Sequence, residues 1–384
     1  MLEKAFRGGW RYRAWLGLLA ALAGAGVFFY VQQLGYGLGI TGMGRSVSWG
    51  LYIANMTFFV GVAASAVMVV LPYSLHNVKE FARITALGEF LAVTAVLAAL
   101  TFVIVDLGQP ARLFNMVLHP SPTSLLFWDM IVLSVYLALN AVIGWASLDA
   151  VRKSEPPLRW LRPLTLLSIP WAVSIHTVTA FIYSGLAARP FWLTALLAPR
   201  FLASAFASGP ALLILACLII RRLTRFDPGS EAIQKLARIV TYAMIISVFF
   251  ILVEFFTVFY GGAPEHVAHF RYLLFGLDGR NALAPWAWTS LALAAAAIAV
   301  LLTPALRRKT GFLALACAAV FASVWMEKGL GLIVPGFVPA PTGEVVDYLP
   351  TMPEIFITLG VWALGALLLT MLYRIAVSVW EEAS

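Results

Sequence analysis

The chain has 384 residues, of which 62% are hydrophobic and only 11% are charged. Soluble domains carry about 25% charged residues, so this composition excludes an ordinary soluble domain and indicates an integral membrane protein. The net charge of +8 does not indicate nucleic-acid binding, because most of the Lys and Arg residues lie in short loops, where they set membrane orientation.

The apolar segments predict an all-α integral membrane protein with one polytopic domain, residues 1–384. A spanning helix needs about 20 mostly apolar residues, and ten runs qualify, at roughly 14–34, 48–71, 84–106, 123–147, 163–186, 201–220, 236–260, 284–303, 311–328 and 353–377. We expect spans two to five and six to nine to form two four-helix bundles, with the first and last spans flanking them. The basic N-terminal tail resembles the start of a signal peptide, but no convincing cleavage site follows, so we expect the first span to be retained.

The distribution of Lys and Arg predicts the orientation. Most of these residues lie in the N-terminal tail, the even-numbered loops and the C-terminal end, which the positive-inside rule assigns to the cytoplasm. The protein is therefore expected to be a multi-pass protein of the cytoplasmic (inner) membrane with both termini inside. The longest connections, residues 261–283 and 329–352, would lie outside and are the expected docking surface. Tryptophans typical of an aromatic belt lie near the expected outer span ends: Trp49, Trp128, Trp192, Trp286 and Trp288.

A polar turn after the third span carries the strongest indication of chemistry. It reads Asp106-Leu107-Gly108-Gln109-Pro110-Ala111-Arg112, and Asp129 enters the next span. Charged groups at membrane depth are costly and usually mark function. We predict that Asp106, Arg112 and Asp129 form a catalytic cluster at the outer face, in which Arg112 holds Asp106 ionised and oriented. The alternative is an ion pair between Arg112 and Asp106 that only stabilises the loop.

Three further ionisable residues, Glu89, His176 and Glu254, lie within spans at different depths. Carboxylates and a histidine staggered in this way are the groups from which intramembrane proton relays are built. We predict a relay from the outer site toward the cytoplasmic side. Each residue could instead be paired locally with backbone or hydroxyl groups.

Asn55 lies within the apolar second span, where a polar side chain must find a hydrogen-bond partner. The sequence leaves open whether that partner is a ligand carbonyl or a neighbouring helix.

The sequence contains no evident redox centre. There are five histidines, and only His176 falls within a predicted span, so a haem with two histidine ligands is not expected. An iron–sulfur cluster needs about four cysteine ligands, and the chain has two. We expect no metal site. Electrons would have to pass to or from a partner protein.

Two motifs resemble those of the NrfD/polysulfide-reductase membrane-subunit family. The second span opens with Trp49-Gly50-x-Tyr52-Ile53, and the third is followed by Asp106-Leu-Gly-x-Pro110-x-Arg112. The resemblance covers nearly the whole chain. Within the family, Pro350-Thr-x-Pro353-Glu354 and the shortage of haem ligands resemble the DsrP subunits of DsrMKJOP complexes, which implies a place in sulfur or sulfite metabolism.

The resemblance implies the quinone-reactive subunit of a multi-subunit oxidoreductase, not an enzyme that acts alone. Such a subunit has no haem or iron–sulfur cluster and exchanges electrons between menaquinone or menaquinol and an extracytoplasmic four-cluster iron–sulfur protein. Carried over to this sequence, the quinone site would be lined by Trp49, Asn55, Asp106 and Arg112. The DsrP-like resemblance further implies a multihaem cytochrome c, a b-haem membrane subunit and a cytoplasmic iron–sulfur subunit as partners, and proton translocation is a further expectation.

Two other classes of function stay open at this point. A secondary transporter or ion pathway would use the same acidic residues, and broken helices near the membrane midplane would favour it. A passive membrane anchor of a redox complex would tolerate neutralisation of every intramembrane acid.

Overall fold

The computed structural model describes residues 1–383, and within that range the chain is helical, with a single isolated bridge between Leu277 and Arg280. Ten helical segments are long and apolar enough to cross a membrane. They confirm the predicted all-α membrane architecture. The segments are built from α1 (Trp10–Tyr36), α2 (Leu51–Val62) with α3 (Val67–Leu75), α4 (Ala82–Asp106), α6 (Leu125–Lys153), α7 (Leu161–Ser184), α8 (Leu197–Leu223), α9 (Ser230–Gly261), α11 (Ala284–Leu302), α13 (Thr310–Lys328) and α15 (Met352–Ala383).

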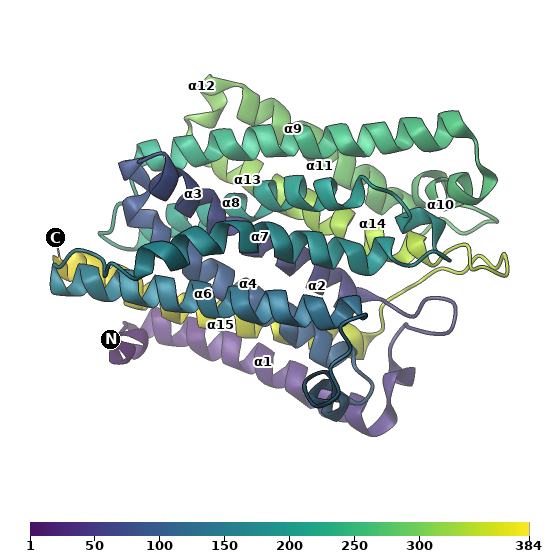
Figure 1. Ribbon diagram of the computed structural model, residues 1–384, viewed down its shortest axis with the longest axis horizontal. Coiled ribbons are helices and arrows are strands. Elements are labelled where there is room, and N and C mark those ends of the chain that lie inside the picture. The colour runs from purple at the N-terminus through teal and green to yellow at the C-terminus, as the bar shows by residue number, and fades with distance from the viewer. Residues whose placement is uncertain (384) are drawn as a thin grey trace.

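The ten spans pack as two four-helix bundles with a flanking helix pair, as the sequence predicts. In the first bundle, α2 and α3 together form one span and pack with α4, α6 and α7. In the second bundle, α8 contacts α9 and α13, and α11 closes the ring between them. Helices α1 and α15 pack against each other, and α15 also packs against α4 (Figure 1). The contact between α1 and α15 is close because a Cβ on Gly26 would lie only 2.6 Å from the Gly360 Cα.

Both termini lie at the same end of the molecule (Figure 1). There Lys4 forms an ion pair of 2.5 Å with Glu382. We call this the terminal end. The opposite end, which carries the short helix α10 (Pro264–Phe275), is called the α10 end.

The second span is not one continuous helix. A 3-10 turn at Ala63–Ser65 separates α2 from α3. Neighbouring helices engage the polar groups around this turn, since the Tyr136 hydroxyl donates to the Ala63 carbonyl at 3.2 Å and the Ser65 hydroxyl donates to the Gly88 carbonyl at 3.2 Å. Helix α8 packs against the turn. The interruption therefore lies at the contact between the two bundles.

The two long connections at the α10 end are largely structured. Residues 261–283 contain α10, and residues 329–352 contain α14 (Leu330–Ile333) and a 3-10 turn at Val334–Gly336. Trp192, predicted as an aromatic-belt residue, is instead fully buried beneath these segments and donates its indole N–H to the Leu332 carbonyl at 2.9 Å. The belt prediction is wrong for Trp192 because the α10-end segments fold over it as a second hydrophobic cluster.

Candidate functional site

A pocket of about 410 Å³ opens at the α10 end. It lies between the turn that leads into α2, the segment after α7, and the segment after α14. Its lining is mostly apolar and small, with one cation: Ser48, Trp49, Gly185, Leu186, Ala187, Ala188, Arg189 and Phe337. Its volume falls within the range of about 300–1,000 Å³ that is typical of small-molecule sites. We call it the aromatic pocket.

Trp49 is the centre of the aromatic side chains around this pocket. Its ring stacks on Trp192 with centroids 5.9 Å apart and meets Tyr183 and Phe337 edge-on at 5.8 and 5.7 Å. Such ring arrangements favour stable packing. The half-buried Trp49 therefore presents a rigid apolar surface to the pocket.

Arg189 supplies the polar group of the pocket. Its guanidinium lies 4.7 Å over the Phe337 ring, and its Nη1 is buried without a hydrogen-bond acceptor among residues 1–383. Burial lowers the pKa of Arg189 from its ordinary value. Sequence reasoning missed this residue, because nothing in a loop arginine indicates that its N–H groups will be enclosed.

Tyr183 connects the aromatic pocket to the buried carboxylates. Its hydroxyl forms a short hydrogen bond with the Thr57 hydroxyl. Asp129 is buried on α6 and accepts a hydrogen bond of 2.6 Å from the Thr179 hydroxyl. Thr179 precedes Tyr183 by one turn of α7, so Tyr183 lies close to Asp129.

Asp106 ends α4, and its Oδ1 is buried without a hydrogen-bond partner among the described residues. The predicted pairing with Arg112 does not form. Arg112 is exposed on a 3-10 turn, Pro110–Phe114, and no Asp106 oxygen lies within 4.0 Å of its nitrogens. The short turn directs the Arg112 side chain away from the end of α4. Arg112 therefore does not hold Asp106 in place.

Glu354 is a buried carboxylate near Asp106 that was not predicted as a site residue. Its Oε1 accepts hydrogen bonds from the Tyr348 hydroxyl and the Leu51 N–H, and its Oε2 accepts one of 3.0 Å from the Gly42 N–H. Its charge acts on Asp106. The sequence signal was present in the Pro-rich motif before the last span, but only the fold shows that this motif reaches the first turn of α2.

Asn55 is occupied by intramolecular hydrogen bonds. Its Oδ1 accepts from the indole N–H groups of Trp325 and Trp362 at 3.0 and 2.9 Å, and its Nδ2 donates to the Leu51 carbonyl. The side chain is fully buried. Of the two alternatives open from the sequence, the structure shows the neighbouring helices as its partner.

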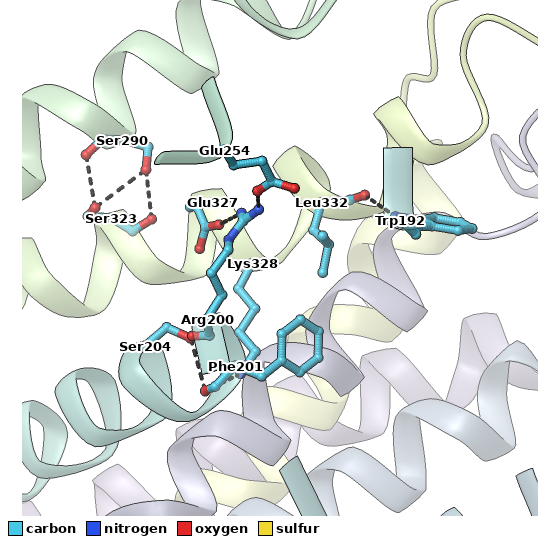
Figure 2. A network of polar contacts seen from close by, with 10 residues as sticks. All are labelled: Trp192, Arg200, Phe201, Ser204, Glu254, Ser290, Ser323, Glu327, Lys328 and Leu332. Carbon is cyan, nitrogen blue, oxygen red and sulfur yellow. Dashed lines mark hydrogen bonds and ion pairs between the residues drawn. The ribbon is translucent and has the colours of Figure 1, made fainter. Parts of the chain in front are cut away.

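Two carboxylates of the second bundle share one cation, as Figure 2 shows. Arg200 on α8 forms ion pairs with Glu254 on α9 and with Glu327 on α13. All three side chains are at most one-fifth exposed. We call these three residues the Arg200 cluster. Glu254, predicted as a relay residue, is therefore held by a cation.

Lys328, adjacent to this cluster, is buried. Its ammonium donates to the Phe201 carbonyl at 3.3 Å and lies 4.2 Å from the centroid of the Phe201 ring. A Cβ on Gly61 would come within 3.1 Å of Lys328 Nζ, so the glycine leaves room for the ammonium.

Glu89 and His176 differ from Glu254. Both carboxylate oxygens of Glu89 and both ring nitrogens of His176 are buried without a hydrogen-bond partner within residues 1–383. The predicted alternative, local pairing with backbone or hydroxyl groups, is therefore absent for these two residues. Across the same residues, no group of three or more His, Cys, Asp or Glu side chains is arranged to hold a metal ion.

Comparisons with known proteins place this chain in a family. A relative from Halobacterium salinarum, named as a putative membrane subunit of dimethyl sulfoxide reductase, is 28% identical over 93% of this chain and 89% of its own length. A second relative, the "Hdr-like menaquinol oxidoreductase integral membrane subunit" of Archaeoglobus fulgidus, is 26% identical over 64% of this chain and 60% of its own length. "Protein NrfD" of Escherichia coli is 26% identical over 74% of this chain and 93% of its own length.

The family model described as "Polysulphide reductase, NrfD" matches residues 39–339, which include the first bundle, the second bundle and the aromatic pocket. The match covers well over half of the chain and agrees with the motifs at Trp49 and Asp106. The chain is a multi-pass membrane protein of the polysulphide reductase NrfD family.

Proposed function

We propose that this chain is the quinone-reactive membrane subunit of an oxidoreductase complex, and that the quinone headgroup binds in the aromatic pocket. The observation that carries the proposal is the position of this pocket, which has a rigid Trp49 surface and the Arg189 guanidinium beside Tyr183. Tyr183 lies one turn of α7 from Thr179, the hydrogen-bond partner of Asp129. The printed names of the relatives, which include a menaquinol oxidoreductase subunit, support a quinone of the menaquinone type.

The pocket suits a flat ring that carries two oxygen atoms. Trp49 and Phe337 offer aromatic surfaces for packing, and Arg189 offers an N–H without an acceptor to a quinone oxygen. Exposed apolar side chains at the adjoining helix ends, Leu126 and Phe181, provide a path from the lipid. The charge-assisted hydrogen bond from Arg189 to the quinone oxygen would contribute about 1.5–3 kcal/mol to binding.

The buried acids would receive the protons that a quinol releases on oxidation. A proton acceptor must come within hydrogen-bond reach, directly or through a bridging group. The Tyr183–Thr57 hydroxyl pair provides such a bridge, and Asp129 and Asp106 are the acceptors we assign. The electrons would pass to an extracytoplasmic iron–sulfur partner docked on the α10 end. We place that end outside, on the positive-inside rule.

Proton transfer toward the terminal end would use Glu89 and His176. Neither has a permanent partner among the described residues, so each is free to exchange a proton. Glu254 is the weakest member of the predicted relay because Arg200 neutralises it. Asn55 and Arg112 are not retained in the quinone site, since Asn55 is engaged by two tryptophans and Arg112 is exposed. We assign Arg112 to the surface on which a partner would dock.

Sulfur or sulfite metabolism, with the multihaem cytochrome c, b-haem and cytoplasmic iron–sulfur partners of a DsrP-like complex, is the setting we infer. This part of the proposal is supported by the Pro350–Glu354 motif and by the shortage of haem ligands in the sequence. The transporter alternative receives one supporting feature, the interruption of the second span at Ala63–Ser65. The corresponding helix of the second bundle, α8, runs unbroken from Leu197 to Leu223, so the pair of broken helices that the alternative calls for is not formed.

The test is a titration of the detergent-purified chain with a fluorescent menaquinol analogue, read by the anisotropy of the analogue so that loss of a tryptophan does not alter the signal. We expect saturable binding that is about tenfold weaker in Trp49→Ala and in Arg189→Gln. Trp160→Ala is the matched control, because Trp160 is exposed at the start of α7 at the terminal end. Absence of saturable binding to folded protein would contradict the proposal and leave the anchor and transporter functions.

A further inference from the structure

A second cavity, at the terminal end of the second bundle, has no part in the proposed quinone site. It measures about 570 Å³ and lies where α8 ends and where α9 and α13 begin, with the short helix α12 (Pro304–Arg307) at its edge. Its polar lining includes four arginines and one carboxylate: Arg221, Arg238, Arg307, Arg308 and Glu231. The volume is again that of a small-molecule site.

The charge of this cavity is not balanced by the protein. Glu231 lies 3.3 Å from Lys235, so its charge is shared with a lysine that does not line the cavity. None of the four arginines has a carboxylate oxygen within 4.0 Å in the part of the chain that the structure describes. Four guanidinium groups that converge on one cavity without counter-charge favour an anion.

Arg307 is held in a fixed position at this site. Its Nη1 donates to the Leu301 carbonyl at 3.0 Å, and its own carbonyl accepts a hydrogen bond of 3.2 Å from the Gln234 side chain. Its Nε is buried and has no acceptor within residues 1–383. The 32-residue helix α9 also begins at the cavity, at Ser230, so the positive end of its dipole lies at the edge of the site.

The surroundings indicate where the anion comes from. Exposed apolar side chains lie within two residues of the cavity lining: Leu302 precedes Pro304, and Phe312 follows Thr310. These residues belong to membrane-spanning segments, so the cavity lies at the level where a bilayer meets water. Basic pockets between spans at this level suit acidic lipid headgroups.

We propose that this cavity binds the phosphate group of an acidic phospholipid, with the acyl chains along the exposed apolar surface of α11 and α13. The arginines contact the phosphate, and the N-terminus of α9 adds N–H donors. A dissolved phosphate has the same recognition chemistry, and the experiment below separates the two sources.

The experiment is native mass spectrometry of the full chain, purified in detergent, stripped of lipid, and titrated with phosphatidylglycerol. We expect one saturable adduct, about tenfold weaker in the double variant Arg238→Gln/Arg308→Gln, whose side chains make no hydrogen bond that the fold requires. The charge-keeping variant Arg238→Lys/Arg308→Lys should retain most of the binding. Arg222→Gln/Arg225→Gln is the matched control, because it removes two nearby charges that do not line the cavity.

Three outcomes would overturn the proposal in whole or in part. Equal phosphatidylglycerol adducts in the wild type, the Gln double variant and the control would exclude the cavity as the site. Equal adducts with phosphatidylcholine would show that binding does not depend on an acidic headgroup. Displacement of the lipid by millimolar inorganic phosphate, with phosphate binding alone as strongly, would keep the anion site and overturn its assignment to a lipid.

Discussion

In the second bundle, Glu254 and Glu327 are both paired with Arg200 (Figure 2), whereas in the first bundle Glu89 and Asp129 are buried with no cation within 4.0 Å among residues 1–383. The paired charges of the second bundle are typical of a structural role, because removal of one partner would leave the other charge buried and unpaired. The unpaired carboxylates of the first bundle are costly to bury unless they exchange protons or contact a ligand. The difference indicates that the buried charges of the first bundle carry the chemistry, whereas those of the second bundle stabilise the fold.

Removal of the Arg200 side chain should have the largest effect on stability. In Arg200→Ala, the carboxylates of Glu254 and Glu327 lose the cation with which both are paired, and breaking a buried pair in this way costs about 3–5 kcal/mol. We expect a clear fall in the melting temperature of the detergent-purified protein. Lys153→Ala is the control, because it breaks a half-exposed pair with Asp149 and should change stability by no more than about 0.5 kcal/mol. Equal melting temperatures for Arg200→Ala and wild type would remove the contrast between the bundles.

Neutralisation of Asp129 should affect function more than stability. Asn can still accept the hydrogen bond from Thr179, so we expect the melting temperature of Asp129→Asn to stay within a few degrees of wild type. Turnover of menaquinol in the assembled complex should fall about tenfold or more, because the proton acceptor is lost. Glu327→Gln in the second bundle should show the reverse pattern, a lower melting temperature with little change in turnover. Unchanged turnover in Asp129→Asn would argue for the passive anchor.

Asn55 sharpens the comparison because it lies in the first bundle but is fully paired. In Asn55→Leu, the indole N–H groups of Trp325 and Trp362 lose their acceptor, at a cost of about 1–3 kcal/mol for a buried unsatisfied group. The affinity for the quinol analogue should stay within twofold of wild type. A large loss of affinity with no loss of stability would return Asn55 to the quinone site.

The smallest expected effect concerns pH and the α10 end. His269 Nδ1 lies 2.6 and 2.9 Å from the carbonyl oxygens of Pro335 and Val338, so Nδ1 carries a proton. Burial, and then the charges of His266 and Arg189, lower the pKa of His269 from its ordinary value of 6.5. Above pH 6.5 the His269 side chain is neutral in both the folded and the unfolded states. As the pH falls below this value, His269 takes up a proton in the unfolded state before it does so in the folded state, so the stability of the folded state decreases.

We therefore expect the melting temperature to fall between pH 8 and pH 5, and His269→Gln to reduce this difference. His119→Gln serves as the control because His119 is an exposed histidine. An identical pH dependence in the wild type and in His269→Gln would show that other groups cause it.

The sequence predicted the spans and their pairing well, because both depend on composition and length. It missed Arg200 because the predicted sixth span began at residue 201, whereas α8 starts at Leu197 and carries Arg200 inward. It did not single out Lys328, the last residue of the predicted ninth span, although the apolar residues that follow it continue as α14 and Lys328 is buried. In both cases the missing information was the partner on another helix, which no spacing within one segment can supply.

The Asp106–Arg112 pairing failed for a related reason. Proximity in sequence suggested an ion pair, but the turn after α4 exposes Arg112 and leaves Asp106 near Glu354, a residue from the opposite end of the chain. Asp129 and Trp49 were singled out from the sequence as polar and aromatic residues at span ends. The structure places the Trp49 ring against Tyr183, which lies one turn of α7 from Thr179, the hydrogen-bond partner of Asp129. Tyr183 was not among the predicted site residues, and it is buried.

The most direct test of the central claim is photoaffinity labelling of the purified chain with an azido-menaquinone, followed by peptide mapping. We predict that labels fall on the segments around Trp49 and on residues 185–189, and that excess menaquinone suppresses them. Suppressible labels confined to α9, α11 or α13 would place the quinone in the second bundle and contradict the division of roles between the two bundles.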